Sequence, residues 1–414
     1  MAVLFEGTGI SLTNPRVRPS RNPNAHSYLI YLDYAATTPL DPLVLRAMMP
    51  FLTDDFGNAS SVHALGRRAR FAVEESREKV ASLIGAEPGE VLFTSGGTEA
   101  NNTVLKGIVC HERGLLTSGA EHESILRPAE ALCRSGCQVQ IVAPGPTGAL
   151  SAEEVQANLT GGASLVSLMH GNNEIGTLTD IEAIVEVAHR RGAIMHCDAV
   201  QTAGFGLLRA DEVAVDLMTI SGHKFYGPKG VGVLFMRGGT DLEPLLAGGA
   251  QERRRRGGTE NVPAIVGFAE AMKLALIEAV DIRENVSRLR DRLLDGLKSM
   301  LREEFVLNTP VGRAPVAPHI LNVSFPPSNG APLDGEMLLL NLDLEGIRVS
   351  AGSACTSGAL EPSHVLRAIG VDRKTAGATI RFSLGRHTSE EDVDATVEAV
   401  ARVLARMRQT AAIV

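Results

Sequence analysis

Three short polar clusters in this sequence directly follow stretches that are apolar enough to be buried strands. They are the Ser-Gly-Gly-Thr run at 95–98, the Asp-Ala-Val-Gln run at 198–201 and the Ser-Gly-His-Lys run at 221–224. Open parallel sheets bind ligands at the carboxyl ends of their strands. We therefore expect the side chains of the three clusters to meet at one edge of a sheet, around one ligand.

The residue types in these clusters match the chemistry of one cofactor. Glycines and a hydroxyl at a helix start can cradle a phosphate, although a tight turn with a helix cap explains such a run on its own. Asp198 ends a strand in an apolar context, where a carboxylate needs a cationic partner. Lys224 stands at another strand end, where it can form a Schiff base. Together these groups meet the demands of pyridoxal phosphate (PLP), which needs a phosphate cradle, an acid for its ring N–H and a lysine.

The elements that must position these residues alternate between short apolar runs and longer helical stretches. Strands are expected at 91–94, 115–117, 139–143, 165–169, 193–197, 217–220 and 232–236. Helices are expected at 67–84, 99–110, 124–134 and 181–191. Such alternation predicts an α/β domain, with a mostly parallel seven-stranded sheet covered by helices on both faces.

The pattern changes after residue 263. Residues 264–302 have apolar positions at helical spacing and predict one long helix or two joined helices. Fewer strands follow, at 320–324, 347–350 and 380–383, and then a last helix at 389–408. Its first turn holds Glu390 and Glu391, where the helix dipole favours acidic side chains. This part of the chain predicts a smaller α+β domain.

The composition limits what the chain can bind. It has 414 residues, a net charge of −8, 4% aromatic residues and no Trp. An acidic chain with few aromatic rings is poorly suited to bind nucleic acid or a membrane surface. The most apolar long stretch, 264–280, carries charged residues at amphipathic spacing, so we expect no membrane span.

The cysteines predict no disulfide framework. They are odd in number and scattered, at positions 110, 133, 137, 197 and 355, which fits a reducing compartment. Cys133 and Cys137 are too far apart for a CxxC pair, so helix packing is expected there and no metal site. Residues 1–29 are polar and are expected to be a flexible extension, with an organelle transit peptide as the alternative.

Five motifs, in their order along the chain, closely resemble those of the cysteine desulfurases, which belong to the class V aminotransferase group of PLP fold type I. The motifs lie at 31–39, 93–99, 172–176, 221–224 and 352–357, and the resemblance covers residues 30 to 408. The Gly-Ser-Ala-Cys-Thr-Ser run at 352–357 is similar to that of the nitrogen-fixation and iron–sulfur-cluster type. The resemblance implies a large PLP-binding domain over 44–277 and a small domain made of 30–43 and 278–414.

The resemblance also implies a role for each matching residue. Lys224 would bind PLP and later move protons, and Asp198 would stay ionised against the ring N–H. Gln201 would donate to the phenolate oxygen, and His122 would stack on the ring and serve as an acid or base. The phosphate ligands of the family match Gly97, Thr98, Ser221 and His223. The residue that reaches the cofactor of the other subunit of a homodimer matches Thr259. The clamp on the substrate carboxylate matches Arg381, together with Asn173.

Cys355 would be the residue that takes sulfur from the substrate. Its neighbours are small and polar, whereas a structural cysteine is more often flanked by apolar periodic residues. A thiolate on such a loop can attack the sulfur of L-cysteine, leaving L-alanine and a persulfide on Cys355. The resemblance implies an acceptor protein for this sulfur, such as an iron–sulfur scaffold or a tRNA-thiolation factor, in the cytoplasm or an organelle matrix.

Several alternatives stay open at this stage. A selenocysteine lyase or an aminotransferase would share the fold and the PLP residues, and the second would need no loop cysteine. A non-catalytic scaffold is disfavoured, because Lys224 is present. The run of four arginines at 253–256 either lines the mouth of the site or lies on a solvated or interfacial loop. His170, His189, His196 and His364 are expected to be structural or at the surface.

Overall fold

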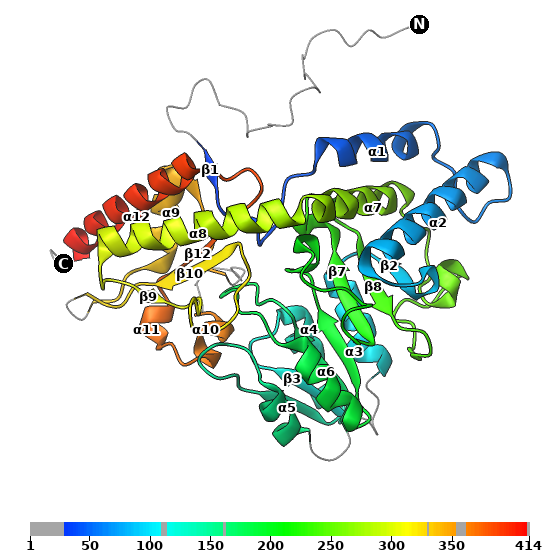
Figure 1. Ribbon diagram of the computed structural model, residues 1–414, viewed down its shortest axis with the longest axis horizontal. Helices are drawn as coiled ribbons and strands as arrows, with labels where there is room; N and C mark the ends of the chain where they lie inside the picture. The colour runs from blue at the N-terminus through cyan, green and yellow to red at the C-terminus, as the bar shows by residue number, and fades with distance from the viewer. Residues whose placement is uncertain (1–28, 109–113, 160–162, 329–330, 353–361, 412–414) are drawn as a thin grey trace, which may run out of the picture.

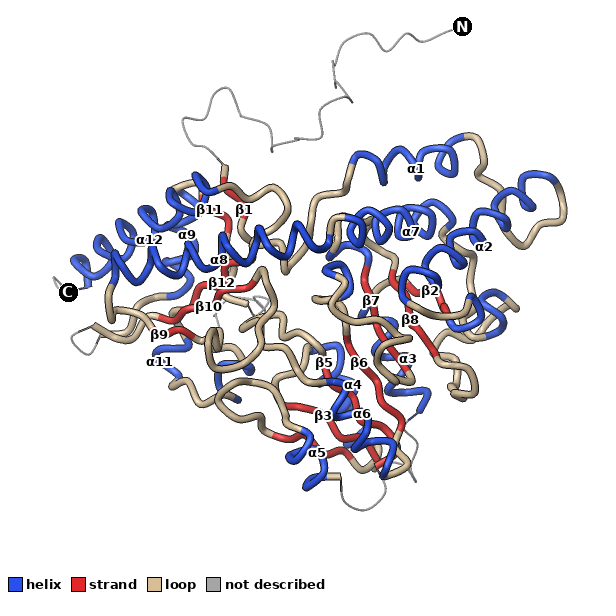
Figure 2. Tube along the Cα trace, in the orientation of Figure 1, coloured by secondary structure: helices blue, strands red, loops and turns tan. Residues whose placement is uncertain are grey.

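The computed structural model describes residues 29–108, 114–159, 163–328, 331–352 and 362–411 (Figure 1). The extension at 1–28, Cys110 and Cys355 therefore lie outside the described residues. The described chain forms two apolar cores. One covers both faces of a large sheet, and the other lies where α8 (Ala279–Leu301), α9 (Gly335–Leu344) and α12 (Glu390–Ala411) pack on a small sheet (Figure 2).

The large sheet has seven strands in the order β2-β8-β7-β6-β5-β3-β4. Their bounds are Val91–Thr94 (β2), Gly114–Ser118 (β3), Val139–Val142 (β4), Ala163–Met169 (β5), Ile194–Asp198 (β6), Leu217–Ser221 (β7) and Gly232–Met236 (β8). β8 runs antiparallel to both of its neighbours, and the remaining pairs are parallel. The predicted α/β class and mostly parallel sheet are confirmed, and each of the seven expected strands is present.

Helices bury both faces of this sheet, as expected for central strands that are apolar on both sides. On one face lie α2 (Ala64–Ile84), α5 (Ala152–Asn158), α6 (Ile181–Arg190) and α7 (Val262–Ile277), with α1 (Pro42–Thr53) packed on α7. On the other face lie α3 (Gly97–Ile108) and α4 (Glu123–Arg134). Short 3-10 turns are η1 (Pro88–Glu90), η2 (Ala203–Phe205), η3 (Gly222–Lys224) and η4 (Gln251–Arg254).

The second core contains an antiparallel sheet in the order β12-β10-β9 and a parallel pair, β1 and β11. These strands are β1 (Ile30–Tyr31), β9 (Val306–Leu307), β10 (Ile320–Ser324), β11 (Ile347–Arg348) and β12 (Thr379–Ser383). The helices are α8 (Ala279–Leu301), α9 (Gly335–Leu344), α10 (His364–Ala368), α11 (Arg373–Ala376) and α12 (Glu390–Ala411). Residues 264–302, expected to form one long helix or two joined helices, form two helices, because Glu278 is both the C-cap of α7 and the N-cap of α8. The domain boundaries at 44–277 and 278–414 stay a prediction.

No helix within the described ranges is long and apolar enough to cross a membrane. Nor do these residues contain a group of three or more His, Cys, Asp or Glu side chains placed to hold a metal ion.

A buried ion pair anchors the turn η4 to the large sheet. The Arg77 side chain on α2 is 2% exposed and donates from both terminal nitrogens to Glu252, at 2.9 and 2.8 Å. Glu252 also accepts the Phe93 backbone N–H of β2 at 3.0 Å. Its backbone has a φ of 44°, in the left-handed region that non-glycine residues rarely adopt. The ion pair therefore holds a strained turn in place.

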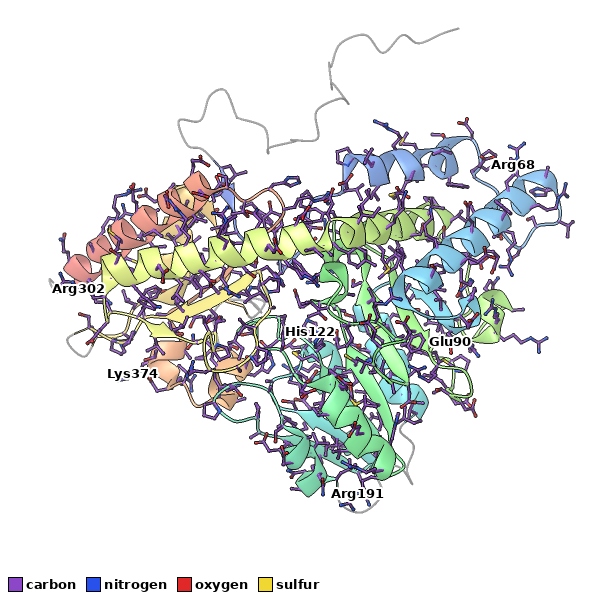
Figure 3. All side chains as sticks on the ribbon, viewed as in Figure 1. Arg68, Glu90, His122, Arg191, Arg302 and Lys374 are labelled. Carbon is purple, nitrogen blue, oxygen red and sulfur yellow. The ribbon has the colours of Figure 1, made fainter. Side chains whose placement is uncertain are left out.

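We predict that Arg77→Met lowers the free energy of unfolding by about 3–5 kcal/mol, because it leaves the Glu252 carboxylate buried without a counter-charge. Urea denaturation followed by circular dichroism measures the change. The control is Arg68→Met, which breaks the pair between Arg68 and Asp55. The Arg68 side chain is 65% exposed (Figure 3), so we expect a loss below about 1 kcal/mol. Equal losses in the two variants would show that the pair with Glu252 does not hold the turn.

Candidate active site

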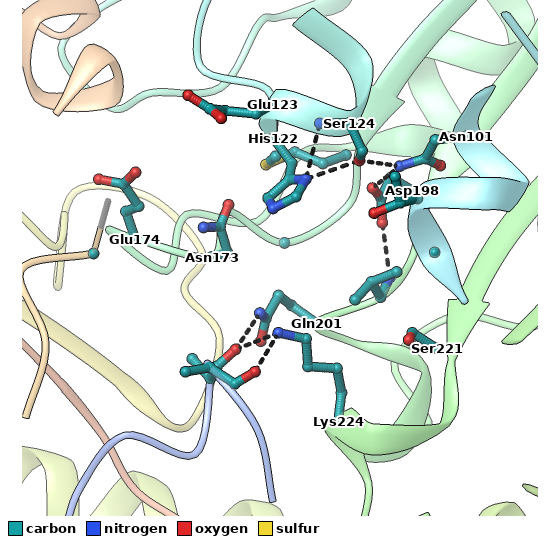
Figure 4. Close-up of a pocket in the computed structure, with 18 of the residues that line it drawn as sticks. Asn101, His122, Glu123, Ser124, Asn173, Glu174, Asp198, Gln201, Ser221 and Lys224 are labelled. Atoms are coloured by element: carbon teal, nitrogen blue, oxygen red, sulfur yellow. Dashed lines mark hydrogen bonds between the residues drawn. The ribbon is translucent and has the colours of Figure 1, made fainter. Parts of the chain in front are cut away.

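One cavity of about 490 Å³ lies at the carboxyl ends of β5, β6 and β7, between the two cores (Figure 4). This volume falls in the range of ~300–1,000 Å³ typical of small-molecule sites. The cavity brings together most of the residues expected from the sequence. Those that line it are Gly97, Thr98, His122, Asn173, Asp198, Gln201, Ser221, His223, Lys224 and Arg381.

Lys224 lies in η3, directly after β7, and its amine reaches the chain segment that leads out of β1. The Nζ atom donates to the backbone oxygens of Ala35 at 2.6 Å and Ala36 at 2.9 Å. Burial, helped by the positive charge of Arg381, lowers the pKa of Lys224 to about 8, against the opposing charges of Asp198 and Asp33. The amine is therefore partly neutral near physiological pH, which suits a lysine that attacks a carbonyl carbon.

Asp198 ends β6 and is 6% exposed. Its Oδ1 accepts the Val200 backbone N–H at 3.0 Å, and its Oδ2 accepts from Asn101 Nδ2 at 2.7 Å. Within the described part of the chain no cationic side chain forms a salt bridge with this carboxylate. A buried carboxylate that faces a cavity without a counter-charge favours a ligand with a positively charged N–H group.

The other end of the cavity suits an anion. Gly97 and Thr98 form the first turn of α3, whose N-terminal N–H groups and dipole favour negative charge. Ser221 ends β7 and faces this turn, because a Cβ atom at Gly97 would lie 3.7 Å from the Cβ of Ser221. That same atom would lie 3.0 Å from Val200 Cγ2, so a larger residue would crowd the turn. His223 completes the group, and burial, helped by the charge of Lys224, lowers its pKa to about 4.

His122 caps α4 and lines the cavity wall. Solvent reaches its ring through the cavity, but the protein atoms around it lower its pKa by desolvation, so the ring is neutral. Gln201 lies across the cavity, where its Nε2 donates to the Ala35 backbone oxygen at 3.0 Å and its Oε1 lies 3.4 Å from His319 Nε2. The cavity thus holds a neutral imidazole on one side and an oriented amide on the other.

Arg381 in β12 brings a guanidinium from the small sheet into the same cavity. Its Nη1 donates to the Asn173 backbone oxygen at 2.8 Å, and its Nη2 forms an ion pair with Asp33 at 2.7 Å. The side chain is 4% exposed, and its Nε atom is buried without a partner among the described residues. A guanidinium with a free donor is suited to bind a carboxylate.

Sequence reasoning missed several cavity residues. Asn101 forms a hydrogen bond with Asp198, and Ser124 forms one with His122. The only sequence signal for these two residues was their position, just after the motif at 93–99 and just after His122. Glu174 accepts a hydrogen bond from Ser363 and packs against Gly352, which lie on the two sides of residues 353–361. His364, expected to be structural, lines the cavity and its Nε2 contacts the Glu121 backbone oxygen at 2.8 Å.

Two expected features do not lie in this cavity. Thr259 is exposed and is not among the cavity residues of its own chain. The arginine run at 253–256 does not line the cavity either. Arg256 pairs with Glu99 at 3.0 Å, and Arg253 and Arg255 donate to the backbone oxygens of η1 residues. Cys355 lies outside the described residues, so its position relative to the cavity stays a prediction.

Comparisons with known proteins agree with this geometry. The class V aminotransferase family profile matches residues 30–396. The cysteine desulfurase IscS of Dictyoglomus turgidum is 43% identical over 383 residues, which span 92% of this chain and 95% of that protein. Among solved structures, a NifS-like protein is 35% identical with a TM-score of 0.84, covering 92% of this chain and 100% of its own. A structure of SspA in complex with cysteine is 32% identical with a TM-score of 0.73, covering 87% and 100%.

The chain belongs to the cysteine desulfurases of the class V aminotransferase family. It is therefore a PLP-dependent enzyme, as the sequence predicted. The residues present fit this cofactor. Among the described residues, Asp198 has no counter-charge, Lys224 has a lowered pKa, and a side chain at position 97 would crowd the first turn of α3.

A pH titration tests the state of Lys224. Because only the neutral amine attacks an aldehyde, we predict that apoprotein takes up PLP faster as the pH rises through about 8, and that the rate then levels off. Stopped-flow absorbance at increasing pH measures this rate. An exposed lysine has a pKa near 10.4. A rate that keeps climbing steeply beyond pH ~9.5 would contradict the burial of this amine.

Proposed function

We propose that this enzyme converts L-cysteine into L-alanine and carries the sulfur as a persulfide on Cys355 to an acceptor protein. The observation that carries the proposal is the convergence of Lys224, Asp198 and Arg381 on one cavity. An amino acid substrate needs an amine-exchanging lysine, an acid for the cofactor ring and a clamp for its carboxylate. The cysteine bound to the related SspA supports L-cysteine as this substrate.

The residues of the chain would divide the work as follows. PLP, when bound, withdraws electrons from the substrate Cα. Asp198 would hold the ring N–H, Gln201 the phenolate oxygen, and the first turn of α3 with Ser221 and His223 the phosphate. Lys224 would bind PLP covalently and move the proton at Cα, and Arg381 would bind the substrate carboxylate, with Asn173 beside it. His122 would lie against the ring and supply or accept a proton.

The sulfur step would then take place at Cys355. Its thiolate attacks the Sγ atom of the substrate, so that an S–S bond forms and the Cβ–Sγ bond breaks. The electron pair of the broken bond stays on the carbon side, which takes up protons to become L-alanine. A reductant or an acceptor thiol then removes the persulfide sulfur. We place this reaction in the cytoplasm, and we propose an iron–sulfur scaffold or a tRNA-thiolation factor as the acceptor.

We predict that Cys355→Ala abolishes the release of sulfide and alanine from L-cysteine in the presence of a thiol reductant. Sulfide and alanine are measured together, and the native protein should form them in equal amounts. Cys133→Ala is the matched control, because Cys133 is a free, exposed thiol on α4 and should not be required. Sulfide release that survives in Cys355→Ala would point to a lyase or aminotransferase mechanism without a loop thiol.

We further propose a homodimer in which Thr259 completes the phosphate site of the partner subunit. Thr259 is exposed and does not line its own cavity, and large apolar side chains on α1 and α2 are exposed as well. Leu52 is 53% exposed and Phe71 is 69% exposed, as expected of residues that meet another protein surface. Arg70 of α2 pairs with Glu260 at 2.9 Å, which joins this apolar surface to the Thr259 segment.

Mixing two inactive variants tests this arrangement. Lys224→Ala and Thr259→Ala are each expected to lose activity, but a mixed dimer holds one site with both native residues. Refolding the two together should restore about a quarter of native activity, because random pairing makes half of the dimers mixed, each with one intact site. Sedimentation of the native protein gives the oligomeric state. A native monomer, or no recovery from mixed dimers, would show that Thr259 acts within its own chain or not at all.

A further inference from the structure

A chain of hydrogen bonds joins His122 to Asp198 through two residues that the proposed mechanism does not use (Figure 4). Asn101 on α3 donates from Nδ2 to Asp198 Oδ2 at 2.7 Å and to Ser124 Oγ at 2.8 Å. Ser124 Oγ lies 2.8 Å from His122 Nδ1. Asn101 and Ser124 are 1% and 7% exposed, so water does not compete for these bonds.

The negative charge of Asp198 decides which group donates and which accepts in each of these hydrogen bonds. A carboxylate accepts only, so the Asn101 amide must turn its NH₂ group toward Asp198. The second hydrogen of that group then points at Ser124 Oγ, which accepts it. Ser124 therefore has its own hydroxyl hydrogen free to donate to His122 Nδ1.

A second, independent donor reaches the same ring nitrogen. The backbone N–H of Ser124 donates to His122 Nδ1 at 3.1 Å, because His122 is the N-cap of α4. A backbone N–H cannot reverse its role, so Nδ1 accepts whichever way the Ser124 hydroxyl turns. The proton of the neutral imidazole must therefore lie on Nε2. Within the described ranges Nε2 has no hydrogen-bond partner, and the ring lines the cavity.

We propose that Asn101 and Ser124 are positioning residues that couple the tautomer of His122 to the charge of Asp198, so that His122 always presents an Nε2–H donor to the reacting atoms. This inference rests on the proposed role of His122 as an acid or base at the cofactor. It assigns that role a direction, because a neutral ring held in this tautomer offers a hydrogen-bond donor at Nε2, while Nδ1 is occupied by the donors of Ser124. The same bonds hold the Asp198 carboxylate in place for the cofactor ring.

The charged groups around His122 agree with a neutral ring. Burial lowers its pKa and Lys224 and His364 lower it further, whereas Asp198 and Glu123 raise it. Protonating Nδ1 would also point its one hydrogen at the Ser124 backbone N–H and would break the hydrogen bond that the Ser124 hydroxyl donates. Without the hydroxyl, the neutral ring loses that donor, so protonating the ring costs less. The doubly protonated ring should then form at higher pH than in the native protein.

Ser124→Ala is the primary test, because it removes the hydroxyl and keeps the backbone N–H. Thr103→Val is the matched control. Thr103 is a buried residue on α3 whose hydroxyl, within the described part of the chain, bonds only to the Glu99 backbone oxygen, and it lies outside the series of bonds between His122 and Asp198. The readout is the ¹⁵N chemical shifts of histidine-labelled protein, with the His122 signals assigned by their loss in His122→Gln. These shifts report which ring nitrogen is protonated and need no turnover.

In the native protein and in Thr103→Val, we expect His122 to show a protonated Nε2 and an unprotonated Nδ1. In Ser124→Ala, the pH at which both nitrogens are protonated should rise. The acid limb of the kcat profile should move to higher pH with it. At neutral pH, kcat should fall by about tenfold, which is part of the ~10²–10⁴-fold rate acceleration that a positioned acid or base supplies. The KM for L-cysteine should stay within about twofold of the native value. Ser124→Thr keeps the hydroxyl and should restore the native shifts.

Two results would overturn the proposal. One is a native His122 with its proton on Nδ1. The other is a Ser124→Ala protein whose shifts and pH profile match those of Thr103→Val. A double variant adds a further check, because Asn101→Leu and Ser124→Ala break one chain of bonds and should not be additive in kcat. If no variant makes sulfide but the shifts behave as expected, the proposed function fails and the coupling stands.

Discussion

The burial of one negative charge organises the site. A carboxylate such as Asp198 is costly to bury unless donors and a counter-charge surround it. The chain supplies two donors, from Asn101 and the Val200 backbone, but no cation among the described residues. The cofactor that this family uses would provide the missing N–H. Three elements meet around this carboxylate: the end of β6 carries Asp198, α3 supplies Asn101, and the N-terminus of α4 supplies His122 and Ser124. The negative charge of Asp198 sets the direction of the hydrogen bonds between them.

The second constraint is that the two cores must meet at the lysine. Lys224 belongs to the large sheet, but its amine bonds to the backbone of Ala35 and Ala36, which follow a strand of the small core. Both carbonyls can approach the amine because the two side chains are small. Arg381 makes the reciprocal contact, from the small sheet to Asn173. A rotation of one core against the other would therefore break contacts of the lysine and of the guanidinium together.

Sequence reasoning reached the large sheet because its strands are short, mainly apolar runs, and it reached the cavity because polar residues at strand ends share one edge. It could not find pairings set by tertiary packing. The two-residue strand β1 is too short to show a period, the strand predicted at 347–350 gives no sign of its pairing with β1, and nothing local makes β8 antiparallel. Asn101 and Ser124 read as ordinary helix residues, because their importance arises only when α3 and α4 pack side by side. The exposed Thr259 illustrates the opposite case, in which the family resemblance names a residue that a single chain cannot place.

In the proposed mechanism, Arg381 would let the cavity select its substrate. Two of its nitrogens already have partners, Asp33 and the Asn173 carbonyl, so a bound carboxylate must share the guanidinium or displace Asp33. Exchanging one carboxylate for another changes the number of charge-assisted hydrogen bonds little, and such an exchange costs far less than burying a new ion pair. An amine without a carboxylate gains nothing from this exchange. Selection for an α-amino acid therefore follows from a guanidinium that is kept paired before the substrate arrives, because that pairing prevents an unpaired buried charge at every stage of binding.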